Sequence, residues 1–243
     1  MKIVIITGAS RGIGQIITSV LAKNDFCVIA NYNHSEKEAF ALCDDLAKQG
    51  LSCIPYKADI SDQTQVNAMV DFVVKRFGKI DLLVNNAGIS RSGLLIDMPL
   101  SDITDLLDTN LLGAILVTQA VARQMLAQHA GNIINISSMW GQVGASCESV
   151  YSASKGGLIA FTKALAKELG YNGINVNCIC PGVIDTTMNA NISQDDLAAL
   201  VSETPCSRLG APQDIANCVL WLASDNASFV NGQIIGVNGG FVI

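Results

Sequence analysis

The stretch KIVIITGASRGIG, residues Lys2–Gly14, joins a short apolar run to a cluster of three glycines. Residues Lys2–Ile6 are mostly β-branched and stop at a glycine turn, which predicts a buried strand. From Gly12 to Lys23 the apolar residues recur at helical spacing, so a helix follows the turn directly. A strand, a glycine turn and a helix in this order predict the first βα unit of a parallel sheet.

The same alternation continues to the end of the chain. Strands are predicted at Phe26–Asn31, Ser52–Lys57, Asp81–Asn85, Asn132–Ser137, Asn175–Ile179 and Gln233–Val237, and helices at Ser35–Gln49, Asp62–Phe77, Ser101–Gln128, Tyr151–Leu169 and Pro212–Ala223. Helices between buried strands indicate an α/β fold, a Rossmann-type doubly wound sheet of seven parallel strands with helices on both faces. Because no repeat or linker interrupts the pattern, residues 1–243 are predicted to form a single domain.

Residues 185–208 make a long connection near the end of the chain, with a short helix predicted at Gln194–Ser202. Insertions at the carboxyl edge of a sheet often close over a ligand. We therefore expect a substrate lid here.

Composition excludes several classes of function. The chain has 243 residues, of which 50% are hydrophobic and 15% charged, with a net charge of −6. Nucleic acids and anionic membranes attract clustered lysine and arginine, so neither is an expected partner. The eight cysteines contain no C-x-x-C pair, which disfavours a zinc site, and no metal is expected. With no signal-peptide or membrane-span pattern, a reduced, cytoplasmic protein is expected.

The glycine turn is a candidate cofactor site. Main-chain N–H groups of Gly8, Gly12 and Gly14, together with a helix N-terminus, would hold the pyrophosphate of a dinucleotide. Further candidate contacts in the turn are Ser10, Arg11 and Ile13. The spacing differs from G-x-G-x-x-G, so an ordinary glycine-rich turn is the alternative.

The second strand bears on which dinucleotide is bound. It ends at Asn31, where an NAD site usually carries Asp or Glu for the ribose 2′-hydroxyl. An acid there would repel a 2′-phosphate, whereas Arg11 would attract one. NADP(H) is therefore predicted, and the alternative for Arg11 is a solvated surface arginine.

Tyr151 and Lys155 are four residues apart on a predicted helix and so share a face. A phenol has a pKa near ~10, and an ammonium group beside it favours the phenolate. Such a pair is typical of a proton donor for a carbonyl that receives a hydride. Ser138, just past a strand, would hydrogen-bond and orient that carbonyl.

In their order along the chain, these features resemble the short-chain dehydrogenase/reductase family, and the match covers essentially the whole sequence. Thr7–Gly14 resembles its cofactor turn, Asn85–Gly88 its fourth-strand motif and Pro181-Gly182 with Thr186 its nicotinamide-side loop. The resemblance implies a catalytic tetrad of Asn110, Ser138, Tyr151 and Lys155.

The resemblance also implies roles for further residues. It places Asp59 and Ile60 at the adenine, Asn85, Ala87 and Gly88 along the cofactor, Pro181, Gly182, Ile184 and Thr186 at the nicotinamide side, Tyr151 and Lys155 beside the cofactor, and Asn110 at a water leading to Lys155. Relatives are commonly homotetramers that pair their long helices, which sets the expected assembly.

Within the family the chain most resembles 3-oxoacyl-[acyl-carrier-protein] reductases, which generally dock their acidic carrier protein with arginines. The corresponding stretches here, Ala127–Gly131 and Gly170–Gly173, contain no arginine. The loss of those charges weakens docking of an acidic partner.

A second resemblance concerns the segment Trp140–Glu148, which is similar to reductases of the 5-aminopentanone-modified lysine of elongation factor P. Trp140 and Glu148 are therefore tentative substrate contacts, because a carboxylate would suit an amine-bearing ketone. Alternatively, Glu148 only favours a helix N-terminus and Trp140 only packs.

Two further functions stay open. The chain could be a non-catalytic NADPH-sensing protein, or an alcohol dehydrogenase that works in the oxidative direction, since the same residues catalyse both directions.

Overall fold

A computed structural model describes residues 1–187 and 193–243 of the chain. Its strands form one parallel sheet in the order β3-β2-β1-β4-β5-β6-β7. The strands are β1 Lys2–Ile6, β2 Phe26–Tyr32, β3 Cys53–Lys57, β4 Leu82–Asn85, β5 Gly131–Ile136, β6 Ile174–Pro181 and β7 Ile234–Val237. The predicted seven-stranded, doubly wound fold is confirmed.

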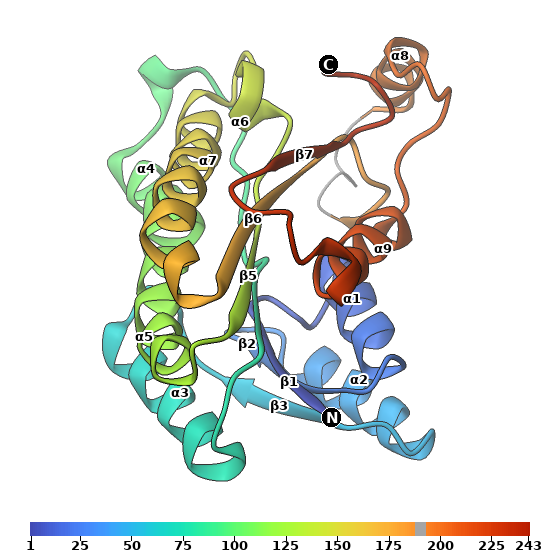
Figure 1. The fold of residues 1–243 in the computed structure, drawn as a ribbon. Helices are drawn as coiled ribbons and strands as arrows, with labels where there is room; N and C mark the ends of the chain where they lie inside the picture. The colour runs from blue at the N-terminus through green and yellow to red at the C-terminus, as the bar shows by residue number, and fades with distance from the viewer. Residues whose placement is uncertain (188–192) are drawn as a thin grey trace.

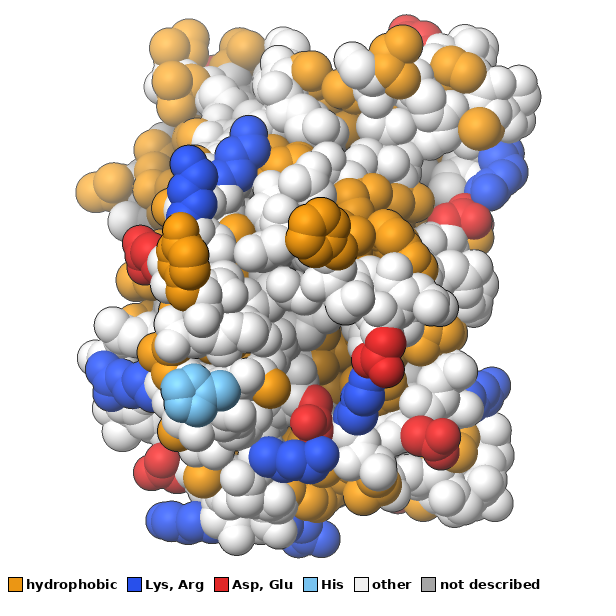
Figure 2. Space-filling model, viewed as in Figure 1, with side chains coloured by type: hydrophobic (Ala, Val, Ile, Leu, Met, Phe, Trp, Pro, Cys, Tyr) orange, Lys and Arg blue, Asp and Glu red, His pale blue; other side chains and the backbone are white. Residues whose placement is uncertain are grey.

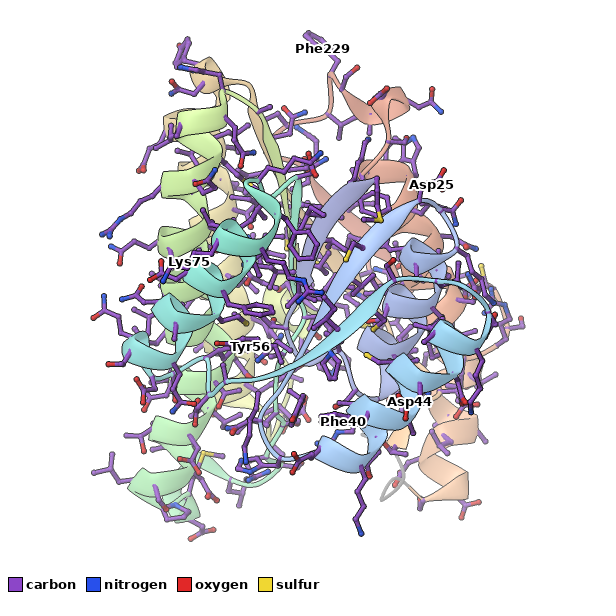
Figure 3. All side chains as sticks on the ribbon, turned by 90° about the horizontal axis from the view of Figure 1, so that it is seen from below. Asp25, Phe40, Asp44, Tyr56, Lys75 and Phe229 are labelled. Atoms are coloured by element: carbon purple, nitrogen blue, oxygen red, sulfur yellow. The ribbon has the colours of Figure 1, made fainter. Side chains whose placement is uncertain are left out.

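Helices cover both faces of the sheet (Figures 1 and 3). The longer ones are α1 Gly12–Ala22, α2 Glu36–Lys48, α3 Gln63–Phe77, α4 Leu100–Leu107, α5 Gly113–Gln128, α7 Ser149–Leu169, α8 Gln194–Glu203 and α9 Pro212–Leu222. One hydrophobic core lies between the sheet and α1, α2 and α9, and a second lies between the sheet and α3, α5 and α7. Among the described residues, no helix is long and apolar enough to span a membrane.

The strand order reverses direction between β1 and β4. From β1 the sheet continues to β2 and β3 on one side, and from β4 it continues to β5, β6 and β7 on the other. In doubly wound sheets, ligands bind outside the carboxyl ends of the strands at this switch point. The glycine turn after β1 and the residues after β4 therefore meet where a ligand site is expected. Thr7 joins them directly, since its N–H donates to Val84 O over 3.0 Å.

The prediction of a single long helix at Ser101–Gln128 was wrong for the middle of that segment. The structure has α4, a π-helical turn at Asp108–Leu112 and then α5. Inside this turn, the Asn110 side chain donates to Ile89 O (2.9 Å) and accepts from Ile89 N (2.8 Å). This tertiary contact fixes the place where the helix widens, and π-turns often mark functional sites.

A short helix, α6 Trp140–Val143, was not predicted. It lies at the upper end of the molecule in Figure 1, near the ends of β6 and β7. The four residues Trp140-Gly-Gln-Val143 contain one glycine and are followed by another, so they gave no helical signal, and tertiary contacts rather than periodicity hold the helix.

The predicted lid at residues 185–208 is described only in part, because residues 188–192 lie outside the described residues. The helix expected there is present as α8 Gln194–Glu203. The role of residues 185–208 as a substrate lid stays a prediction, and so does the single domain of residues 1–243.

A row of buried polar side chains crosses the middle of the sheet. Asn85 Nδ2 donates to Asn135 Oδ1 (2.9 Å) and to Thr118 Oγ1 (2.8 Å), and Asn135 Nδ2 donates to Thr162 Oγ1 (2.9 Å). The row ties β4 and β5 to α5 and α7. Buried polar groups that lose their partners are costly, so this row favours one packing of the helices that carry the site.

We expect Asn135→Ala to lower the free energy of unfolding by roughly 2–4 kcal/mol, because Asn85 Nδ2 and Thr162 lose a buried partner. Urea denaturation followed by circular dichroism measures this. Asn67→Ala, at an exposed position on α3, is the matched control and should change stability by less than about 0.5 kcal/mol. Equal stability of the two variants would contradict a structural role for the row.

Candidate active site

The glycine turn is shaped by close approach of main chains. A Cβ on Gly8, whose φ is +62°, would lie 2.8 Å from Ala87 Cα. A Cβ on Gly14 would collide with the Gly8 carbonyl oxygen and lie 2.6 Å from Asn86 Nδ2. Helix α1 begins at Gly12, so its N-terminus faces the turn. This cradle fits a pyrophosphate, which would be held by N–H groups and the helix dipole.

Asn86 holds the cradle, although sequence analysis did not single it out. Its Nδ2 donates to Thr7 O (3.0 Å) and Gly8 O (2.9 Å). Thr7 Oγ1 in turn accepts from the N–H groups of Asn86 and Ala87, each over 3.0 Å. The two neighbouring asparagines of the Asn85–Gly88 motif indicated a contact with the turn, but the sequence does not show which of the two faces it.

Two predicted cofactor contacts have side chains that are turned into the protein. Asn85 is 2% exposed and belongs to the buried polar row. Asn31 is also 2% exposed; its Nδ2 donates to Ala58 O (3.0 Å), and its main-chain oxygen accepts from Ala9 N (2.9 Å). Both residues stay predicted cofactor contacts, but any such contact would have to use their main chain, because their side chains face the interior.

The predicted adenine contacts differ from each other. Asp59 accepts from the Ser61 main chain (2.9 Å), the Ser61 hydroxyl (2.6 Å) and Asn33 Nδ2 (3.0 Å). Partial burial works to raise the pKa of Asp59, but these hydrogen bonds outweigh it and hold that pKa below the usual value. Ile60 is buried and packs where a Cβ on Gly113 would lie, so it belongs to the core more than to an open site.

The predicted nicotinamide-side loop reaches the glycine turn. Thr186 lies 3.8 Å from the position of a Cβ on Gly12. Gly182 N donates to Val237 O (3.0 Å), and Ile184 forms a parallel bridge with Gly210. Pro181, the last residue of β6, thus opens a loop that returns across the carboxyl edge. The structure brings the two ends of the predicted cofactor site together.

Two of the four candidate catalytic residues, Asn110 and Lys155, meet beside Gly88. A Cβ on this glycine would lie 3.2 Å from Lys155 Nζ and 3.3 Å from Asn110 Oδ1. The Ser138 side chain is close enough to the Tyr151 phenol to lower its pKa. Lys155 Nζ lies 5.9 Å from the centroid of the Tyr151 ring. The predicted tetrad residues are thus close to one another, and their catalytic roles stay predictions.

Burial dominates the electrostatics of the pair. Lys155 is 4% exposed, and its Nζ donates to Ile136 O over 3.0 Å. Desolvation lowers the pKa of Lys155 to about 8. Burial raises the pKa of Tyr151 to about 12, and the Ser138 hydrogen bond opposes this only in part. The expectation that the phenol pKa lies below its usual value was thus wrong, because burial of the phenol has the largest effect on that pKa.

Two cysteines under the site also act on Lys155, and sequence analysis missed them. Cys178 and Cys180 are two residues apart on β6, so their side chains lie on the same face of the sheet, and both are fully buried. Both raise the pKa of Lys155 against the larger effect of desolvation, and Cys180 raises that of Tyr151. Hydrogen bonds, first from Cys178 and then from Ser137, lower the pKa of Cys180. Cys180 directly precedes Pro181, which was the available signal.

The two tentative substrate contacts flank Ser138 and Tyr151. Trp140 N donates to Ser138 Oγ (3.1 Å), so the tryptophan is fixed next to that hydroxyl. Glu148 Oε1 accepts from Ser90 Oγ (3.1 Å), and burial raises the pKa of Glu148. Glu148 also raises the pKa of Tyr151, which places its charge close to the phenol. Among the described residues, no cluster of side chains suits a metal ion.

Comparison with known proteins agrees with this geometry. A family model described as "Enoyl-(Acyl carrier protein) reductase" matches residues 8–242. The chain belongs to the short-chain dehydrogenase/reductase family. That membership makes it an oxidoreductase, and it confirms the resemblance drawn from the motifs.

Individual members of the family are similar over nearly their full length. The chain is 41% identical to the 3-oxoacyl-[acyl-carrier-protein] reductase of Staphylococcus aureus strain Mu50, covering 98% of this chain and 97% of the relative. It is 39% identical to that of Escherichia coli K12, covering 98% and 96%. The crystal structure of a 3-oxoacyl-[acyl-carrier protein] reductase from Brucella melitensis superposes with a TM-score of 0.93 at 34% identity, covering 100% of this chain and 92% of the other.

The low pKa of Lys155 has a consequence for stability. The pKa of Lys155 in the folded protein, about 8, lies below the ordinary 10.5. Below pH 8 the buried charge therefore lowers the free energy of unfolding, and this loss disappears as the pH rises from 8 toward 10.5. The penalty at neutral pH is about 3 kcal/mol. We expect Lys155→Met to raise the melting temperature at pH 7 by roughly 5 °C and this gain to shrink above pH 8.

Scanning calorimetry of the protein without added nucleotide, from pH 6.5 to 10, measures the effect. Lys163→Met is the matched control, because Lys163 is exposed on the same helix. A Lys155→Met variant that is less stable than wild type at pH 7, or a gain independent of pH, would contradict the assigned penalty.

Proposed function

We propose that the protein reduces a ketone to a secondary alcohol with NADPH, acting on a 3-oxoacyl-type substrate. The observation that carries the proposal is the meeting of Lys155 Nζ and Asn110 beside Gly88, with the Ser138 side chain close enough to the Tyr151 phenol to lower its pKa. This arrangement lies at the carboxyl edge of the sheet, adjacent to the glycine turn.

The residues divide the reaction among them. NADPH, when bound, supplies the hydride. The Ser138 hydroxyl orients the ketone oxygen, and the Tyr151 hydroxyl donates a proton to it. Because its pKa is about 12, Tyr151 carries that proton throughout the neutral range. As negative charge develops on the phenol oxygen, the nearby Lys155 ammonium stabilises it in a site that excludes water.

Asn110 acts by position in this proposal. Its side-chain oxygen and nitrogen are occupied by Ile89, and Nδ2 also donates to Ser154 Oγ over 3.2 Å. Any contact with a water near Lys155 would therefore involve its main chain. The side chain holds the residues that follow β4 against α7, which carries Tyr151 and Lys155.

Preference for NADPH over NADH rests on charge. Strand β2 ends at Tyr32 and is followed by Asn33, so no carboxylate occupies the place of the usual acid. Asp59 contacts Asn33, and its oxygens are occupied by Ser61 and Asn33. Arg11 is exposed at the start of α1, where it can reach a 2′-phosphate.

The proposal includes a cytoplasmic homotetramer. All eight cysteines are free, as in a reducing compartment. Several of the exposed large hydrophobic side chains lie around α4, and two more, Trp221 and Phe229, lie on and after α9. Phe229, which follows α9, extends clear of the fold in Figure 3. Such surfaces support contacts between copies.

A second candidate substrate is the 5-aminopentanone-modified lysine of elongation factor P, and Glu148 favours it. Its half-buried carboxylate beside Tyr151 would attract an amine at the far end of the ketone. The expected carrier-protein surface also lacks cations. A Cβ on Gly173 would lie 2.6 Å from His129 O, so the segments 127–131 and 170–173 adjoin and neither contains lysine or arginine. Lysine and arginine side chains are scattered among acidic ones on the face in Figure 2.

We expect Tyr151→Phe to lower kcat for reduction of ethyl acetoacetate by at least about 10³-fold while NADPH binding stays within about threefold of wild type. NADPH oxidation and fluorescence titration give the two readings. Turnover equal to wild type would contradict the proton-donor role. A wild-type protein that binds NADPH but reduces no ketone would instead indicate a sensor, and faster oxidation of the alcohol by NADP⁺ would indicate the reverse direction.

We expect Glu148→Gln to lower kcat/KM for the aminopentanone-modified lysine by roughly tenfold, with less than about twofold change for acetoacetyl-carrier protein. The amide keeps the shape and the Ser90 contact but removes the charge. Equal loss on both substrates would show that Glu148 only shapes the site, and no loss on either would remove it from the substrate contacts.

A further inference from the structure

The C-terminal residues bring a second aromatic ring to the candidate active site. The rings of Trp140 and Phe241 meet edge to face, with centroids 5.6 Å apart and planes at 88°. Edge-to-face contact is a favoured geometry for aromatic pairs. Since Trp140 N donates to Ser138 Oγ, the pair begins next to the hydroxyl proposed to orient the ketone.

The tryptophan side of this contact cannot easily move. A Cβ on Gly141 would lie 2.7 Å from the main-chain carbon of Lys155 and 2.9 Å from its oxygen, so α6 lies directly on α7. Met139 N donates to Pro181 O over 2.9 Å. The helix that carries Trp140 is therefore held between the candidate catalytic lysine and the end of β6.

The phenylalanine side is held by a compact turn after β7. Asn238 Oδ1 accepts from Gly240 N (3.0 Å), and Asn238 Nδ2 donates to Val242 O (2.9 Å). Gly239 and Gly240 both have positive φ, at +66° and +86°, which glycine tolerates and other residues rarely do. This turn fixes the direction in which the Phe241 ring points.

The same turn contacts two other parts of the site. A Cβ on Gly182 would lie 2.7 Å from Asn238 Cα, so the turn lies against the loop at Pro181-Gly182. Cys206 N donates to Gly239 O over 3.0 Å, and a Cβ on Gly240 would lie 3.1 Å from Pro205. The ring pair thus lies among α6, the loop after β6 and the segment after α8, at the end of the molecule where Figure 1 shows α6, α8 and the C-terminus.

We propose that Trp140 and Phe241 form an aromatic wall that limits the size of the substituent on the ketone. The wall would select compact substrates over long acyl chains. This inference rests on the proposed reductase function and narrows its substrate class. Both rings are rigid and their main chains are anchored, so a longer chain must displace a packed ring. The penalty grows with chain length, which makes it a determinant of specificity.

The test compares two thioesters of N-acetylcysteamine, the 3-oxobutanoyl and the 3-oxooctanoyl forms, with the full chain and NADPH. We expect wild type to favour the shorter substrate by about tenfold or more in kcat/KM. Phe241→Ala and Trp140→Ala should each shift the ratio toward the longer substrate by about tenfold. Phe229→Ala is the matched control, because this fully exposed phenylalanine lies outside the wall, and it should leave the ratio unchanged.

Milder variants keep the test decisive if an alanine variant unfolds. Phe241→Leu and Trp140→Phe should shift the ratio in the same direction by a smaller factor. A wild-type ratio near one, or variants that lower kcat/KM equally for both thioesters, would overturn the aromatic wall and leave the reductase function standing. A wild type that reduces neither thioester nor ethyl acetoacetate would overturn the proposed function itself.

Discussion

Burial of the Lys155 ammonium between α7 and the ends of β5 and β6 is the constraint on which the site depends. This amine is buried, and its Nζ donates a hydrogen bond to the Ile136 carbonyl oxygen. An isolated buried charge is unfavourable, and here the pKa falls to about 8 as a result. The fold retains this charge because the two core clusters on either face of the sheet provide the larger stabilising free energy. A group that destabilises the free protein is then available to stabilise charge that forms during reaction.

Close approach of main chains is the second requirement, and glycines provide it. Gly8 and Gly14 let the turn after β1 lie against Ala87 and Asn86. Gly88 leaves room for Lys155 Nζ beside Asn110, and Gly141 lets α6 lie on α7. Each of these positions would place a Cβ within 3.2 Å of another group. The site is therefore formed mainly by the packing of short segments, with few side chains projecting into it.

The sequence predicted the fold well because its signals are local. Runs of β-branched residues and helical spacing identify strands and helices without any knowledge of their neighbours. The meeting of the candidate residues followed from topology, since the carboxyl ends of parallel strands share one edge. The π-turn at Asn110 could not be predicted, because it depends on Ile89, which is distant in sequence. Nor could the sequence show that Asn86 faces the glycine turn while Asn85 faces the core, or that Phe241 meets Trp140. The direction of the Tyr151 pKa shift depended on how deeply the site is buried, which no local pattern reports.

The central claim is that Tyr151 stays protonated at neutral pH in the free protein, ready to donate. Ultraviolet titration of phenolate absorbance in wild type, with that of Tyr151→Phe subtracted, isolates this one tyrosine among four. The account predicts no difference signal between pH 6 and pH 10, because the pKa of Tyr151 is about 12. A difference titration with a midpoint below pH 9 would contradict it, since Lys155 would then outweigh burial.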